Sequence, residues 1–116
     1  MRYRLITVGR PARRFHAQAC THYEERLTKL ARIETNEVKE GRGADPAETR
    51  AKEAAALRAA ADGRIVALDE RGRSWRSEAL ARHVTELEVQ GVSRLSLWIG
   101  GADGLDPALR NEADEV

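Results

Sequence analysis

Hydrophobic and polar positions along this chain recur at spacings that distinguish strands from helices. Residues 2–9 alternate and then turn apolar, and residues 94–100 form a second apolar segment, so both predict strands. Residues 64–69 form a short continuous apolar run, which is typical of a strand covered on both faces. The weaker alternation of residues 32–38 indicates a fourth strand, at an edge of the sheet.

Apolar side chains three or four positions apart predict a helix after each of these strands. Asp45 precedes Pro46, and Glu48 follows three positions later, which is a strong helix-start signal because both carboxylates can accept bonds from free backbone N–H groups. Ser77 is predicted to cap the third helix. The predicted helices span residues 15–30, 46–62, 77–90 and 105–116.

This alternation predicts an α/β fold with a mostly parallel sheet and helices on both faces, because a helix supplies the crossover that parallel strands need. The length of 116 residues predicts a single domain, residues 1–116. In such sheets ligands bind beyond the carboxyl ends of the strands. The loops expected at that edge are residues 9–14, 69–76 and 100–106.

Composition and charge add constraints on the class of protein. The single cysteine, Cys20, excludes an internal disulfide, and without a long apolar run or an apolar leader we expect a cytoplasmic protein with no membrane segment. A net charge of +1 is too small to indicate a polyanionic partner by itself. The chain has seventeen arginines and three lysines, and five of the arginines lie within residues 1–23, which contain no acidic residue. Arginine suits phosphate binding, although a GC-rich genome would give the same bias.

The most informative motif is the glycine-rich turn "WIGGADG", residues 98–104. A dinucleotide-binding fingerprint would need a glycine at Ile99 and normally follows the first strand. No Gly-Lys-Ser/Thr follows, which excludes a P-loop. The turn is therefore either a tight strand-to-helix reversal or a place where the backbone closely approaches a ligand.

Other candidate chemistry is sparse. Asp69 could bond a ligand hydroxyl or belong to a solvated turn, and Trp75 could stack on a base or anchor its loop to the core. His16 and Cys20 share a helix face but supply only two ligands, so no metal site is expected and Cys20 is interpreted as buried packing. No nucleophile-elbow motif occurs, and the acid pairs 24–25 and 114–115 are interpreted as solvated helix faces. Hydrolytic chemistry therefore has little support.

Four motifs together resemble one family. The segments "LITVGR", "YEERL", "RIVALDERG" and "WIGGADGL" occur in the order and at the separations of the RlmH group of SPOUT-class RNA methyltransferases. The resemblance implies a SPOUT (α/β-knot) fold and S-adenosylmethionine-dependent methylation of N3 of a pseudouridine in 23S rRNA of the large ribosomal subunit. It also implies a methyl-donor pocket lined by Leu68, Gly100, Gly101 and Gly104.

Charge and loop position suggest a role for three further residues. Arg10, Arg13 and Arg14 follow the first strand, where they are predicted to bind rRNA phosphates and to favour loss of the N3 proton. A solvated basic face is the alternative interpretation of this cluster.

Members of this family extend beyond the position of Val116 with a strand, an "LPH"-type loop, a long helix and a basic tail, which form the knot and the homodimer interface. On that resemblance the 116 residues are a SPOUT domain that ends before the knotted segment. We therefore expect this chain alone to bind S-adenosylmethionine weakly or not at all, to be inactive on RNA, and to self-associate through uncovered surface. The alternative function is a non-catalytic module that binds ribosomes or rRNA. A general nucleotide-binding domain is a third hypothesis, which the missing lysine and fingerprint disfavour.

Overall fold

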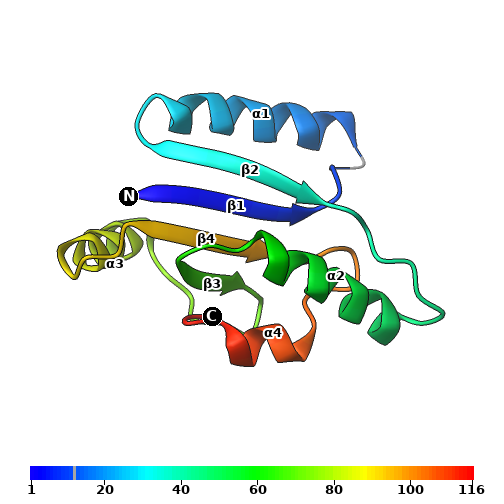
Figure 1. The fold of residues 1–116 in the computed structure, drawn as a ribbon. Coiled ribbons are helices and arrows are strands. Elements are labelled where there is room, and N and C mark those ends of the chain that lie inside the picture. Colours follow the sequence, from blue (N-terminus) through cyan, green and yellow to red (C-terminus); the bar gives the residue numbers. More distant parts are fainter. Residues whose placement is uncertain (12) are drawn as a thin grey trace.

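The computed structural model describes residues 1–11 and 13–116, within which four strands alternate with four helices. The strands are β1 (Arg2–Val8), β2 (Arg32–Val38), β3 (Arg64–Leu68) and β4 (Arg94–Ile99). The helices are α1 (Arg14–Thr28), α2 (Pro46–Ala60), α3 (Ser77–Val89) and α4 (Pro107–Glu112). All paired strands are parallel, in the order β2-β1-β4-β3 (Figure 1). The predicted parallel α/β sheet, with residues 32–38 at its edge, is confirmed.

The start of α2 follows from its sequence signal, whereas the start of α3 does not. The Glu48 N–H donates to Asp45 Oδ1 at 2.8 Å, and Glu48 in turn accepts from the Ala44 N–H at 3.0 Å. The prediction that Ser77 caps α3 is wrong, because Ser77 is already the first helical residue and the N-cap position belongs to Arg76. The arginine side chain has no hydrogen-bond acceptor, so no side-chain cap is made there.

The predicted helix over residues 105–116 is too long, because α4 ends at Glu112. Residues 114–116 instead run beside β3, where the Ala67 N–H donates to the Glu115 carbonyl at 2.9 Å and Val66 and Glu115 form a parallel bridge. β3 is an edge strand, so its outer backbone groups need partners that a helix could not supply. The expectation that β3 is covered on both faces fails at its last residue, since Leu68 is 48% exposed, whereas the other residues of β3 are buried or half-buried.

One face of the sheet carries the main core. Helix α2 crosses this face and α4 lies beside it (Figure 1). The buried apolar side chains of this cluster are Ile6, Ala54, Leu57, Ala67, Trp98, Leu105 and Leu109. On the opposite face, burial and then the negative charge of Glu88 of α3 raise the pKa of Tyr3.

Helix α1 forms as predicted but lies beside edge strand β2 and buries none of its residues (Figure 1). Its apolar stripe is exposed instead of joining the core, including Phe15, Tyr23 and Leu27, followed by Leu30 just after the helix. In the part of the chain that is described, no helix is long and apolar enough to cross a membrane.

Candidate functional site

The carboxyl ends of β3 and β4 lie side by side, because Leu68 pairs with Ile99 in register. The loops that follow these two strands enclose a hollow of about 560 Å³. Its lining includes the four residues expected to hold the methyl donor, Leu68, Gly100, Gly101 and Gly104. The structure therefore brings these residues together at one edge of the sheet, and their role in binding stays a prediction.

The glycine turn at the end of β4 is tight enough to require its glycines without any ligand. The Gly104 N–H donates to the Gly101 carbonyl at 3.0 Å, and Gly104 has a φ of +81°, which side chains disfavour. A Cβ on Gly100 would lie 2.6 Å from the carbonyl carbon of Gly104 and 2.8 Å from the Leu105 nitrogen. The interpretation as a tight reversal is thus confirmed, and the same glycine backbone also forms one wall of the hollow.

Asp69 stabilises the wall of the hollow opposite the glycine turn. Its side chain is only 7% exposed, accepts from the Arg71 N–H at 2.9 Å and lies 3.4 Å from Nη1 of Arg110. Its carbonyl accepts from the Gly72 N–H, which closes the turn after β3. The solvated-turn interpretation of Asp69 is therefore wrong, because the carboxylate is occupied within the protein and positions Arg110 at the hollow.

A buried acid lies directly behind the glycine turn. Glu53 of α2 is 4% exposed; its Oε2 accepts weakly from the Gly41 N–H at 3.4 Å, and among the described residues its Oε1 has no hydrogen-bond partner. Burial is the main cause that raises the pKa of Glu53, the bond from Gly41 opposes it, and the charges of Asp103 and Glu40 add to it. A Cβ on Gly101 would lie 2.9 Å from Glu53 Oε2, so the acid and the glycine fit together.

The three arginines predicted to bind RNA lie outside this hollow. Arg10 pairs with Glu37 of β2 at 2.9 Å, while Arg13 occupies the N-cap position of α1 and Arg14 begins the helix. All three side chains are exposed. The loop after β1 also starts at the carboxyl ends of the strands, but β4 separates β1 from β3, so this loop begins at a different place from the loop after β3. Residue 12 of the loop lies outside the described part of the chain.

Trp75 packs its loop against α3, outside the core cluster to which one of its two interpretations anchored it. Its ring stacks on His83 of α3 with centroids 4.8 Å apart, and the Arg73 guanidinium lies 4.0 Å above it. His83 also contacts the Glu115 carboxylate, which pairs with Arg64 at 2.8 Å. Burial alone would raise the pKa of Glu115, but the bonds from Arg64 and His83 outweigh it and lower that pKa.

Residues 114–115 are consequently not a solvated helix face, and that prediction is corrected by their pairing with β3. The prediction of buried Cys20 is also wrong: its thiol is exposed because α1 packs no side chain into the core. His16 is exposed. Within residues 1–11 and 13–116, no group of three or more His, Cys, Asp or Glu side chains is arranged to hold a metal.

Sequence reasoning missed three charged residues around the glycine turn. Arg50 lines the hollow from α2 and its Nη1 lies 3.4 Å from the Asp103 carbonyl, Arg110 lines it from α4, and Glu53 lies behind it. Arg110 had a weak signal, since it lies four positions after the predicted helix start at Asp106. Arg50 and Glu53 had none, because charged residues in an alanine-rich helix are usually solvated.

The parallel sheet and the glycine turn define an α/β protein whose candidate site lies at the carboxyl edge of its strands. A family model described as "Predicted SPOUT methyltransferase" matches residues 1–116. This chain therefore belongs to the SPOUT methyltransferase family.

Curated relatives carry the name "Ribosomal RNA large subunit methyltransferase H". The relative from Phenylobacterium zucineum (strain HLK1) is 42% identical over 118 residues, which cover 98% of this chain and 75% of that protein. The relative from Anaeromyxobacter sp. (strain Fw109-5) is 40% identical, with 100% of this chain and 77% of that protein covered. One from Caulobacter vibrioides (strain ATCC 19089 / CIP 103742 / CB 15) is 36% identical over all of this chain and 76% of its own length. The resemblance predicted from the four motifs is confirmed, and the chain spans about three quarters of these relatives.

Proposed function

We propose that this chain serves methyl transfer from S-adenosylmethionine to N3 of a pseudouridine in 23S rRNA of the large ribosomal subunit, as one SPOUT-like domain over residues 1–116. The family and the names of the relatives support an rRNA methyltransferase. The observation that carries the proposal is the hollow between the ends of β3 and β4, which has the glycine turn on one side and Leu68 on the other.

The lining of this hollow fits the proposed donor. A volume of about 560 Å³ is within the usual range for small-molecule sites. The donor contains an apolar and aromatic part, which suits the half-exposed Leu68, and a positive sulfonium group with no phosphate, which suits a backbone wall lacking lysine. Asp103 and Arg71 also line the hollow and offer opposite charges to the amino and carboxyl groups of its methionine part.

When bound, S-adenosylmethionine would supply an electrophilic methyl group. The protein's own part is to hold the donor pocket in one shape and to align the acceptor with it, which lowers the entropic cost of reaction. The closed turn between Gly101 and Gly104 and the Asp69–Arg110 pair keep the two walls of the hollow fixed. Arg10, Arg13 and Arg14 are proposed to contact rRNA phosphates, since they are exposed at the same sheet edge.

We propose further that the protein works in the cytoplasm as a homodimer, as its resemblance implies. The exposed side chains of Phe15, Tyr23 and Leu27 on α1 support an additional packing surface, because aromatic and aliphatic groups gathered on one helix are typical of interfaces. Donor affinity of the 116-residue chain alone is proposed to be low.

Methylation of ribosomes that lack the modification tests this function. Transfer of radiolabelled methyl groups is measured with the 116-residue chain and with a fusion that appends the last quarter of the Phenylobacterium zucineum relative. We expect the fusion to methylate and the chain alone to be much weaker. In the fusion, Leu68→Asp should abolish transfer, because it places a charge in the proposed apolar wall. Leu80→Asp is the matched control, since Leu80 is 46% exposed on α3, close to the 48% of Leu68.

Transfer by neither protein, or transfer unchanged by Leu68→Asp, would contradict the proposal. Ribosome binding without methylation, and insensitive to added S-adenosylmethionine, would instead support the non-catalytic module.

A further inference from the structure

Three strands begin with an arginine at the same level of the sheet. Arg2 at the start of β1 is in register with Arg32 of β2 on one side and with Arg94 of β4 on the other. Neighbouring parallel strands lie about 4.8 Å apart, and residues in register point to the same face. Like charges directly opposite one another destabilise a sheet. Neither the core nor the candidate donor site explains this row, here called the arginine row.

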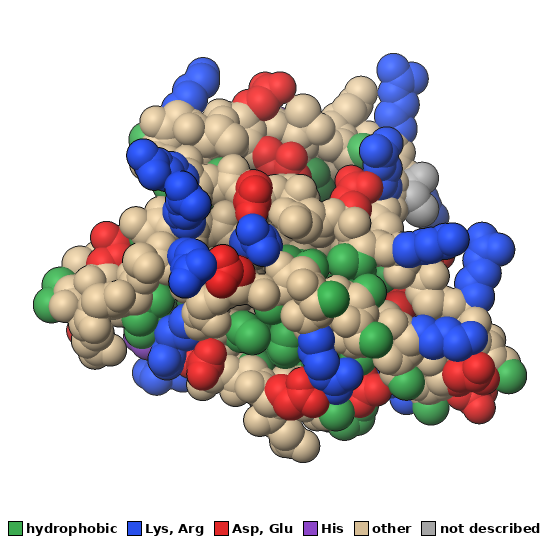
Figure 2. All heavy atoms as spheres, in the orientation of Figure 1, with side chains coloured by type: hydrophobic (Ala, Val, Ile, Leu, Met, Phe, Trp, Pro, Cys, Tyr) green, Lys and Arg blue, Asp and Glu red, His purple; other side chains and the backbone are tan. Residues whose placement is uncertain are grey.

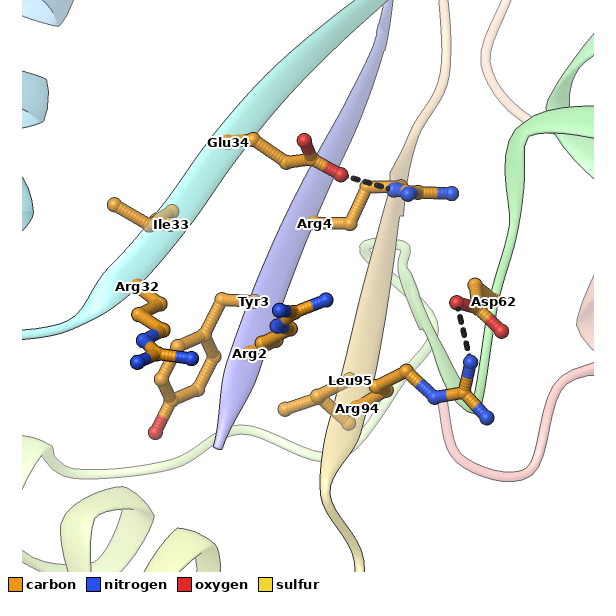
Figure 3. Close-up of a pocket in the computed structure, with 9 residues that line it drawn as sticks. All are labelled: Arg2, Tyr3, Arg4, Arg32, Ile33, Glu34, Asp62, Arg94 and Leu95. Carbon is orange, nitrogen blue, oxygen red and sulfur yellow. Dashed lines mark hydrogen bonds and ion pairs between the residues drawn. The ribbon is translucent and has the colours of Figure 1, made fainter.

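The arginine row borders a separate hollow of about 380 Å³, at the sheet edge opposite the glycine turn (Figure 3). Arg4 of β1 also lines it, and among the described residues the acids of the lining are Glu34 and Asp62. Four arginines thus face two carboxylates.

Two of these arginines are already paired and two are not. Arg4 Nε pairs with Glu34 at 2.6 Å and its Nη1 donates to the Ala60 carbonyl at 2.9 Å, while Arg94 pairs with Asp62 at 2.9 Å. Within the described part of the chain, Arg2 and Arg32 have no carboxylate within 4.0 Å of their guanidinium groups. Figure 3 shows both side chains extending into the hollow. The excess positive charge therefore lies on Arg2 and Arg32.

In the described part of the chain, no helix covers this end of the sheet on the face that α2 crosses. Helix α2 lies over the carboxyl half of the strands and ends near their amino half at Ala60 (Figure 1). Lys and Arg side chains gather over the amino ends of β1, β2 and β4 on the face shown in Figure 2, at the left of the view. A solvated face needs polar residues but favours neighbours of opposite charge, so three arginines in register point to an anionic ligand.

We infer that the arginine row, Arg32, Arg2 and Arg94, binds the phosphate backbone of a single RNA strand. This inference rests on the proposed rRNA substrate but adds a contact at the other edge of the sheet. Guanidinium groups form planar, two-pronged bonds to phosphate oxygens, and a row of them across neighbouring strands matches a polymer of repeated phosphates. The row lies within a hollow, which a flat membrane surface does not enter, so RNA fits better than anionic lipid.

Salt-dependent RNA binding tests the row. Fluorescence anisotropy measures binding of a labelled uridine oligonucleotide of about 20 residues to the 116-residue chain between 50 and 200 mM salt, without S-adenosylmethionine. For the double variant Arg2→Gln/Arg32→Gln we expect at least tenfold weaker binding at low salt. The slope of log affinity against log salt should become shallower by about 1.4, at roughly 0.7 per lost phosphate contact on a single strand.

The matched control is Arg76→Gln/Arg82→Gln, which removes two exposed charges from the start and middle of α3. We expect a smaller loss of affinity from it. The folded state of Arg2→Gln/Arg32→Gln should be at least as stable as the parent in thermal unfolding, because the substitution relieves repulsion. A loss of stability would mean that the row is structural and would overturn the inference.

Two further results would overturn it: equal effects of the two double variants on RNA binding, or row-dependent binding to phosphatidylserine vesicles but not to RNA. Failure of this inference is distinguishable from failure of the proposed function through the fusion described above. If the fusion methylates ribosomes and its Arg2→Gln/Arg32→Gln form shows a raised KM for ribosomes with an unchanged kcat, both stand. If the fusion methylates ribosomes and its Arg2→Gln/Arg32→Gln form has the same KM as the unsubstituted fusion, only the arginine row is refuted.

Discussion

Gly100→Ala is the sharpest test of how the glycine turn is built. The new Cβ would lie 2.6 Å from the carbonyl carbon of Gly104 and 2.8 Å from the Leu105 nitrogen, whereas ordinary contacts begin at 3.4 Å. The two sides of the turn would therefore have to separate by about 0.8 Å. Both opposing atoms belong to the backbone, so no change of rotamer can relieve the contact.

The cost of this separation can be placed at about 2–3 kcal/mol, the upper part of the range for overpacking in a rigid site. For a chain of this size that corresponds to a fall in Tm of roughly 10 °C. Urea unfolding followed by far-UV circular dichroism measures the change in unfolding free energy. In the fusion with the appended relative segment, donor binding by calorimetry should fall as well, because the displaced Gly104 backbone lines the hollow.

Gly91→Ala is the matched control for Gly100→Ala. Gly91 has a φ of +95° and no atom within 4 Å of an added Cβ, so the substitution costs only backbone strain of about 1–2 kcal/mol. It lies after α3, outside the candidate site, and should leave donor binding unchanged. A Gly100→Ala protein within about 0.5 kcal/mol of the parent in stability, with unchanged donor affinity, would refute the steric account of the turn.

Three further predictions concern the core and the surface. Glu53→Gln should raise the unfolding free energy at pH 7 by roughly 1–2 kcal/mol and change it little below pH 4.5, the ordinary carboxyl pKa. The raised pKa of Glu53 means that the folded state of the parent loses stability as the pH rises above 4.5. Urea titrations at the two pH values measure this difference, and equal effects at both would contradict it. Trp98→Phe should lower the unfolding free energy by about 2–4 kcal/mol, since it leaves a cavity and removes the indole N–H that donates to the Leu57 carbonyl at 2.9 Å. Trp75→Phe, which changes a half-buried stack, should lower the unfolding free energy by less in the same assay. Sedimentation should show concentration-dependent self-association of the 116-residue chain that Leu27→Asp reduces, and an unchanged profile for that variant would exclude α1 as the packing surface.

The elements that were predictable are those whose cause is local in sequence. The capping pair Asp45 and Glu48 fixes the start of α2 because its partners lie within four residues. The apolar periods of the strands and helices predicted parallel strand directions, because a helix between two strands supplies the crossover that parallel strands need. The glycine turn was located for the same reason, since Gly101 and Gly104 bond each other.

What was missed depends on contacts between distant positions. The residues after α4 pair with β3 across about fifty positions, and nothing near Glu115 in the sequence announces Val66 as a neighbour. Periodicity shows which face of α1 is apolar but not whether a partner covers it, so the burial of Cys20 was wrongly predicted. The arginine row needs the register of three strands, which no local pattern supplies.

The two ends of β4 connect the candidate donor site with the arginine row. Arg94 begins this strand and Gly100 follows its end six residues later, a separation of about 20 Å along an extended chain. An RNA long enough to contact both the donor site and the arginine row binds more tightly, because binding at one contact raises the effective concentration of the RNA at the other. A short RNA that reaches only the donor edge gains nothing from the row. The fusion should therefore lose its dependence on Arg2 and Arg32 when ribosomes are replaced by an acceptor fragment of a few nucleotides, while its dependence on Leu68 persists.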